Sequence, residues 1–191
     1  MKTTRKASAL TQMNAIAGLS LGLNAALAQP LPEVSTGRIE RLPAIASQYV
    51  DPRPVDVWLP ADYSPARRYQ VLYMHDGQML YDAGKSWNHQ AWDVHLAVDR
   101  LVKAGRIADT IVVGVWNNGP LRHSEYMPQQ FLPHVPEPWR QAYIDQSLAG
   151  KPRADAYLRY LVQELKPAID ARYATPPIAN TPPSWAAAWA G

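Results

Sequence analysis

One short apolar segment that ends in a polar turn constrains this chain more than any other feature. The segment Tyr69–Asp82 reads YQVLYMHDGQMLYD, in which the apolar run Val71–Met74 is followed directly by HDGQ at 75–78. A short apolar run that stops at a glycine is typical of a strand covered on both faces, as in a parallel sheet. Ligands of open α/β sheets bind beyond the carboxyl ends of the strands, so the loop 75–78 is the first candidate for chemistry.

The residues that follow predict a helix and a second buried strand. Apolar residues recur at helical spacing between residues 90 and 104, with Asn88 as the expected N-cap and Gly105 as the C-terminal stop. The segment 109–116, DTIVVGVW, is again a buried strand. Strand, helix and strand in this order predict a right-handed parallel crossover, so residues 69–116 form one βαβ unit.

The flanking segments predict further elements of the same sheet. Strands are expected at 38–45 and 54–59, and a helix at 154–172 that Pro167 should kink. Between residues 117 and 151 the chain is rich in proline. A segment of that length without an expected helix or strand is either functional or disordered.

Several motifs, taken in their order, resemble the putative esterase family of α/β-hydrolases, which includes esterase D and enterochelin-esterase-like proteins. They are VLYMHDGQMLYD, VGVWN at 113–117, Arg122 with EYMP at 125–128, and ELKP at 164–167. The resemblance covers roughly residues 50–175. It implies an incomplete α/β-hydrolase fold: a mostly parallel sheet with an antiparallel N-terminal start and flanking helices, formed by residues 29–175.

The resemblance also implies that the loop after the strand expected at 69–75 supplies an oxyanion-hole N–H, which corresponds here to Gly77 or Gln78. The alternative is that residues 75–77 form only a turn. His75 and Asp76 are not expected to act as a catalytic pair, because adjacent residues at a strand end point to opposite faces.

Five other side chains are candidates for a substrate pocket: His75, Asp76, Trp87, Arg122 and Tyr126. Arg122 either holds a substrate carboxylate or phenolate or pairs with Glu125, and the pair is favoured. The aromatic residues either line a pocket or only pack. The histidines show no metal-ligand spacing, so neither a metal nor another cofactor is expected.

Charge and composition exclude some classes of partner and suggest export. Of 19 Lys and Arg residues, Lys2, Arg5 and Lys6 precede residue 29; the rest balance the 16 Asp and Glu residues, so no nucleic-acid partner is indicated. The absence of cysteine excludes disulfides and a Cys nucleophile. A basic start, an apolar stretch and Ala26-Leu27-Ala28 predict a signal peptide at 1–28, although an amphipathic N-terminus is the alternative. The mature protein is expected to be periplasmic or secreted and not membrane-bound after cleavage.

The residues expected to carry ester hydrolysis are missing. No G-x-S-x-G occurs in the sequence, and the family places its nucleophile elbow just beyond Tyr173. The tail 176–191 is expected to be out of frame and disordered. Read in another frame, the codons of 181–191 admit TAVMGSSMGG, with both glycines forced by the TGG codons of Trp185 and Trp189 followed by alanine. GC-rich codons, which give Ala, Pro and Gly in any frame, are the alternative explanation.

Two functional hypotheses follow. In the first, the chain is part of a serine-dependent carboxylic-ester hydrolase acting on a small-molecule ester, truncated by a frameshift and without catalytic residues of its own. In the second, it is a non-catalytic module that binds a ligand or a partner through the segment 117–151.

Overall fold

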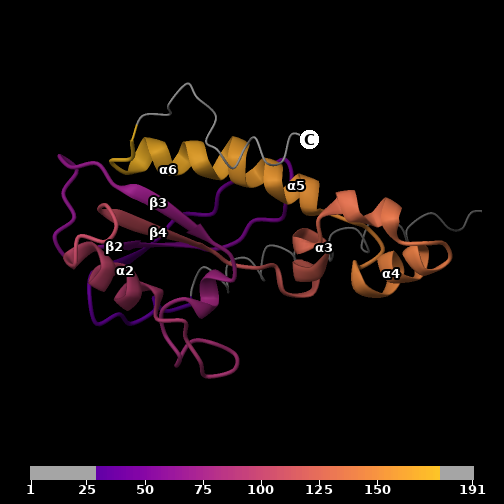
Figure 1. The fold of residues 1–191 in the computed structure, drawn as a ribbon, viewed down its shortest axis with the longest axis horizontal. Helices are drawn as coiled ribbons and strands as arrows, with labels where there is room; N and C mark the ends of the chain where they lie inside the picture. Colours follow the sequence, from indigo (N-terminus) through magenta and orange to yellow (C-terminus); the bar gives the residue numbers. More distant parts are fainter. Residues whose placement is uncertain (1–28, 177–191) are drawn as a thin grey trace, which may run out of the picture.

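The computed structural model describes residues 29–176. The expected signal peptide at 1–28 and the expected out-of-frame tail from residue 177 onward lie outside the described residues, so the structure tests neither. Within the described part, a mixed sheet lies between helices, as an α/β fold requires (Figure 1).

The sheet has four strands in the order β1-β2-β4-β3. They are β1 (Arg38–Arg41), β2 (Val55–Leu59), β3 (Gln70–Met74) and β4 (Thr110–Val115). The antiparallel start is confirmed, because β1 pairs antiparallel with β2. Parallel pairing, expected for most of the sheet, is confined among the described strands to β3 and β4, since β2 also runs antiparallel to β4.

The two central strands are buried along their whole length because both of their faces are covered. Val57 and Val113, opposite each other in the ladder, belong to a core shared with Leu165 and Ile169. On the other face, Trp58 and Val112 pack in a core with residues of α2 (Val94–Lys103). This two-sided burial explains the continuous apolar run of β4.

A long helical segment covers the face of the sheet opposite α2 (Figure 1). It consists of α5 (Ala154–Arg159), the π-helical turn η4 (Tyr160–Leu165) and α6 (Lys166–Arg172). The expected disturbance near Pro167 takes the form of this π turn just before the proline, which stands in the first turn of α6. The wider turn accommodates a backbone carbonyl that a proline without an N–H cannot satisfy.

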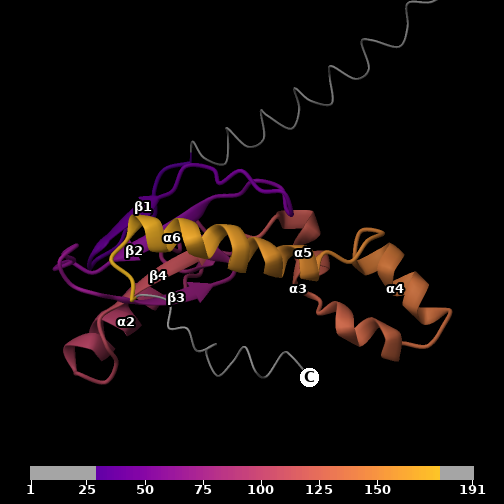
Figure 2. The same ribbon diagram turned by 90° about the horizontal axis from the view of Figure 1, so that it is seen from above.

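Two details differ from the sequence-based expectation. The helix expected from residue 90 begins at Val94, because the side chains of Asn88 and Ser86 accept the backbone N–H of Gln90 within the preceding loop and Asp93 takes the N-cap position. The segment 117–151 is folded into short helices, which Figure 2 shows extending beyond the end of the sheet. They are η2 (Gly119–Leu121), α3 (Arg122–Tyr126), η3 (Gln129–His134) and α4 (Trp139–Ser147).

Between residues 29 and 176, no helix combines the length and the apolar character needed to cross a membrane. Nor does that part of the chain gather three His, Asp or Glu side chains in a geometry that could hold a metal ion.

Candidate functional site

The candidate site is built around Asp76, which lies two residues beyond the end of β3. Its carboxylate accepts two hydrogen bonds from Arg122, from Nε to Oδ1 at 2.8 Å and from an Nη to Oδ2 at 2.7 Å. Asn117, just after β4, donates its side-chain N–H to Oδ1 at 2.7 Å, and the hydroxyl of Tyr126 lies 3.4 Å from the same oxygen. These partners lower the pKa of the Asp76 carboxyl, the hydrogen bond from Arg122 most of all.

Asp76 has a left-handed backbone, with φ 55° and ψ 45°. This conformation costs a non-glycine residue about 1–2 kcal/mol, and aspartate is one of the residues that tolerate it best. It turns the chain sharply from β3 into the short 3₁₀-helix η1 (Gly77–Met79). The hydrogen bonds to the Asp76 side chain offset the cost and fix the turn.

Gly77 is required by its close approach to β4. A Cβ atom at this position would lie 2.6 Å from the carbonyl carbon and oxygen of Gly114 and 2.8 Å from the ring of Trp116. Gln78 ties the same loop to the end of β4, because its side-chain oxygen accepts the backbone N–H of Asn117 at 3.2 Å. Within residues 29–176, the backbone N–H groups of Gly77 and Gln78 have no hydrogen-bond acceptor. In the described part of the chain, two amides are therefore held in place without a hydrogen-bond acceptor.

His75 is the first residue of this loop, and it contacts Tyr157 as well as Tyr126, which it shares with Asp76. Its Nδ1 is 2.9 Å from the hydroxyl of Tyr157, and its ring centroid is 5.0 Å from that of Tyr126. Removal from water lowers the pKa of His75, which favours the neutral imidazole, and raises that of Tyr126 to about 12. No hydrogen bond joins the side chains of His75 and Asp76 in the described structure, as expected for adjacent residues at a strand end.

Arg122 does not pair with Glu125, contrary to the sequence-based expectation. Glu125 instead receives two hydrogen bonds, at 2.6 and 2.7 Å, from Arg53, which lies just before β2. Both side chains of this pair are almost completely buried. Since Glu125 is turned inward on α3, Arg122 is left to pair with Asp76.

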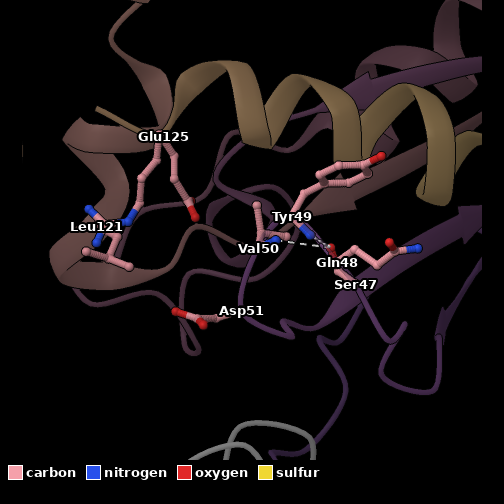
Figure 3. A pocket seen from close by; sticks show the side chains of 8 residues that line it. Ser47, Gln48, Tyr49, Val50, Asp51, Leu121 and Glu125 are labelled. Carbon is pink, nitrogen blue, oxygen red and sulfur yellow. Dashed lines mark hydrogen bonds between the residues drawn. The ribbon is translucent and has the colours of Figure 1, made fainter. Parts of the chain in front are cut away.

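Two cavities border the segment 117–151. Figure 3 shows the first, of about 260 Å³, with the Glu125 carboxylate and Leu121 on one side and residues 47–51 on the other. Its surface is mainly polar. The second, of about 490 Å³, is mainly apolar and is lined by Met127, Val135, Trp139, Ala142 and Tyr143 together with Gln146 and Ser147.

Most of the candidates chosen from the sequence lie together. Arg122 and Tyr126 reach back to the loop 75–78, whereas Trp87 is 82% exposed and makes none of the cluster's hydrogen bonds or ring contacts. Sequence reasoning missed Asn117 and Tyr157 as members of the cluster. The position of Asn117 directly after a parallel strand was a usable signal, but nothing in the helical pattern of 154–172 distinguishes Tyr157.

Comparison with known proteins gives consistent results. Residues 47–182 match the family model described as putative esterase. No curated protein matches the sequence. Among solved structures, the BES protein from Bacillus cereus matches with a TM-score of 0.50 at 18% identity. The match covers 77% of this chain and 51% of the BES chain.

An IroE-like serine hydrolase from Shewanella oneidensis matches with a TM-score of 0.47 at 21% identity, and the match covers 72% of this chain and 39% of the hydrolase chain. A ferulic acid esterase from Anaeromyces mucronatus matches with a TM-score of 0.43 at 18% identity, and the match covers 78% of this chain and 47% of the esterase chain. The match with the BES protein shows the fold. The chain spans about half or less of the length of these three structures.

Proposed function

We propose that residues 29–176 of this chain, which belongs to the putative esterase family, supply the oxyanion-binding part of a carboxylic-ester hydrolase site. We further propose that the 191-residue chain does not itself hydrolyse esters. The observation that carries the first proposal is the turn at Asp76, which holds two amides, Gly77 and Gln78, that have no acceptor among the described residues, at the carboxyl end of β3. The substrate is a small-molecule ester.

The chemistry of acyl transfer explains why such amides matter. When a nucleophile attacks an ester, the carbonyl oxygen becomes negatively charged, and fixed N–H donors stabilise that charge. The Asp76 ion pair with Arg122 leaves the amides free and keeps them from reorienting. The described part of the site therefore provides electrostatic stabilisation.

The proposed lack of ester hydrolysis agrees with the contacts of the serines. Among the described residues, no serine hydroxyl is hydrogen-bonded to a histidine; Ser124, for example, bonds the backbone oxygen of Lys151. Without a nucleophile the covalent step is lost. We expect the purified chain to release no chromophore from p-nitrophenyl acetate or butyrate above the rate in buffer. Turnover that co-purifies with the chain and survives further purification contradicts this.

The frameshift and the oxyanion role are tested separately. Sequencing the gene beyond codon 175 is expected to show a G-x-S-x-G in the alternate frame, and its absence ends the frameshift hypothesis. In the protein made from the frame-corrected gene, Gln78→Pro removes one amide donor and should lower kcat by about 10²–10³. Gln78→Ala keeps that N–H and is the control. Equal losses in the two variants would contradict the oxyanion role.

Export belongs to the same proposal. The basic and apolar segment 1–28 directs the chain to the periplasm or the medium, and cleavage follows Ala28. Mass spectrometry of the chain from fractionated cells should find a mature N-terminus at Gln29. An intact Met1 on cytoplasmic protein would contradict export.

The apolar cavity favours a second candidate function, a non-catalytic binding module. Trp139 lines this cavity and is 70% exposed, so an aromatic or apolar ligand could cover it. Calorimetric titration with benzoate should show binding that Trp139→Ala removes and Trp87→Ala preserves, because Trp87 is also exposed but lies outside the cavity lining. Identical titrations of both variants would exclude this binding mode.

A further inference from the structure

Helix α3 depends on tertiary contacts for its position. It has five residues, and a helix of that length is not stable by itself. It nevertheless carries both Arg122 and Tyr126, two of the side chains that hold Asp76. Whatever fixes α3 therefore fixes the turn that presents the Gly77 and Gln78 amides.

Arg53 links α3 to the residues that precede the central strand β2. Its two terminal nitrogens each donate to one carboxylate oxygen of Glu125, at 2.6 and 2.7 Å. Its Nε and one terminal nitrogen also donate to the backbone oxygen of Asp51, at 3.3 and 3.2 Å. Because Arg53 closely precedes the central strand β2, these bonds attach α3 to the sheet itself.

Arg53 also reaches the other side of the site. Its guanidinium lies over the ring of Tyr157, 5.3 Å from the centroid, and over that of Tyr160 at 5.7 Å. The hydroxyl of Tyr157 is the partner of His75. One buried guanidinium thus contacts Tyr157, the partner of His75, and Glu125, which lies on the helix that carries two partners of Asp76.

We infer that Arg53 is a positioning residue for the amide pair Gly77 and Gln78: through Glu125 it sets α3, and α3 sets Asp76. This inference rests on the proposed oxyanion role of those amides. The planar fork of arginine matters here, because lysine offers a point charge and cannot bond both carboxylate oxygens in one fixed geometry. Arg53→Lys should therefore fail to restore what Arg53→Met loses.

The Asp76 carboxyl reports the position of α3, since Arg122 is the main cause of its lowered pKa. The groups that face this carboxyl are Arg122, Tyr126, His75 and the Asn117 amide. Carbon-detected NMR of the full chain, labelled at Asp, gives its titration midpoint. In Arg53→Met, and equally in Arg53→Lys, we expect the midpoint to rise toward the ordinary Asp value of about 3.9.

Reference variants make the result decisive. Arg122→Met gives the Asp76 midpoint expected when the carboxyl has lost its main partner. Lys166→Met removes an ion pair on α6 and should leave the Asp76 midpoint at its native value. An unchanged Asp76 midpoint in Arg53→Met overturns the inference, and so does full restoration by lysine.

Two further measurements cover misfolding and separate this inference from the proposed function. If Arg53→Met does not fold, Glu125→Gln tests the same link, because it keeps one acceptor but loses the ionic fork; a native Asp76 midpoint there overturns the inference. The titration needs no ester turnover. Suppose that the Asp76 midpoint rises in Arg53→Met but that Gln78→Pro keeps full activity in the frame-corrected protein. The oxyanion role would then be refuted, whereas the control of Asp76 by α3 would stand.

Discussion

Two arginine–carboxylate pairs meet on helix α3, and they differ sharply in their exposure to water. In the pair of Arg53 and Glu125 the side chains are 2% and 1% exposed, whereas in the pair of Arg122 and Asp76 they are 42% and 9% exposed. Water screens the outer pair and leaves its net contribution to stability small, but the inner pair has no solvent to replace a lost partner. The inner pair should therefore govern folding and the outer pair the local geometry of the site.

The largest effect should follow from breaking the inner pair. Glu125→Ala leaves the Arg53 guanidinium buried without its carboxylate, and such a change typically costs about 3–5 kcal/mol of the free energy of unfolding. Urea unfolding followed by circular dichroism measures it. The double variant Arg53→Met/Glu125→Met removes both charges and should recover much of the loss. A single variant within about 1 kcal/mol of the native chain would show that the inner pair does not govern folding.

A smaller effect is expected from removing the carboxylate of the outer pair. Asp76→Ala loses the acceptor for Arg122 and Asn117 and places a less tolerant residue in the left-handed conformation. The loss should be about 2 kcal/mol, because Arg122 can return to water. Asp76→Asn keeps one acceptor and the tolerance of that backbone, so urea unfolding should place it between alanine and the native chain. Equal stability of alanine and native chains would mean that the turn needs no support from this side chain.

Acid should weaken the site in two stages. The pKa of His75 is lowered mainly by burial, so its contribution is present above the ordinary value of 6.5 and is lost as the pH falls through the folded value. The pKa of Asp76 is lowered chiefly by Arg122, so its contribution is lost only at pH below 3.8.

Unfolding free energies measured from about pH 8 to about pH 3 test this order of loss. The stability difference between the native chain and His75→Asn should change below pH 6.5. The difference between the native chain and Asp76→Asn should shrink only at the acid end. A change in the Asp76→Asn difference near neutral pH would contradict the assignment.

The contrast between the two pairs also shows how far the sequence could lead. The four strands were predicted within a few residues because β2, β3 and β4 are apolar runs bounded by turn residues, a local signal. The wrong partner for Arg122 has a different origin. Its neighbour Glu125 is three residues away on the same helix, but the true partner, Asp76, is 46 positions distant, and Glu125 is taken by Arg53 from 72 positions away.

The partners in such ion pairs depend on which side chains of the helix face the protein interior. The sequence of α3 has no apolar periodicity that would identify its buried face. Its five residues, RHSEY, contain one aromatic residue and no aliphatic one. The loop 75–78 could be singled out for the opposite reason, because a glycine soon after an apolar run marks both a turn and a close backbone approach. The expectation that this strand is covered on both faces was wrong, since β3 lies at the edge of the described sheet and none of its residues is buried. A Cβ atom on residue 77 would meet the Gly114 carbonyl at 2.6 Å, which agrees with that close approach.

The smallest effect should come from Arg122→Lys, which keeps the charge of the outer pair and changes only its geometry. Lysine can bond one oxygen of Asp76 but not both, and the pair is half open to water, so the free energy of unfolding should fall by less than about 1 kcal/mol. The Asp76 pKa should rise part of the way toward its ordinary value, because one of two charge-assisted bonds remains. The unfolding free energy and the Asp76 pKa together distinguish the two pairs, because a change in the outer pair should shift the Asp76 pKa while hardly affecting stability. A loss of several kcal/mol in Arg122→Lys would show that the outer pair, like the inner one, holds the fold.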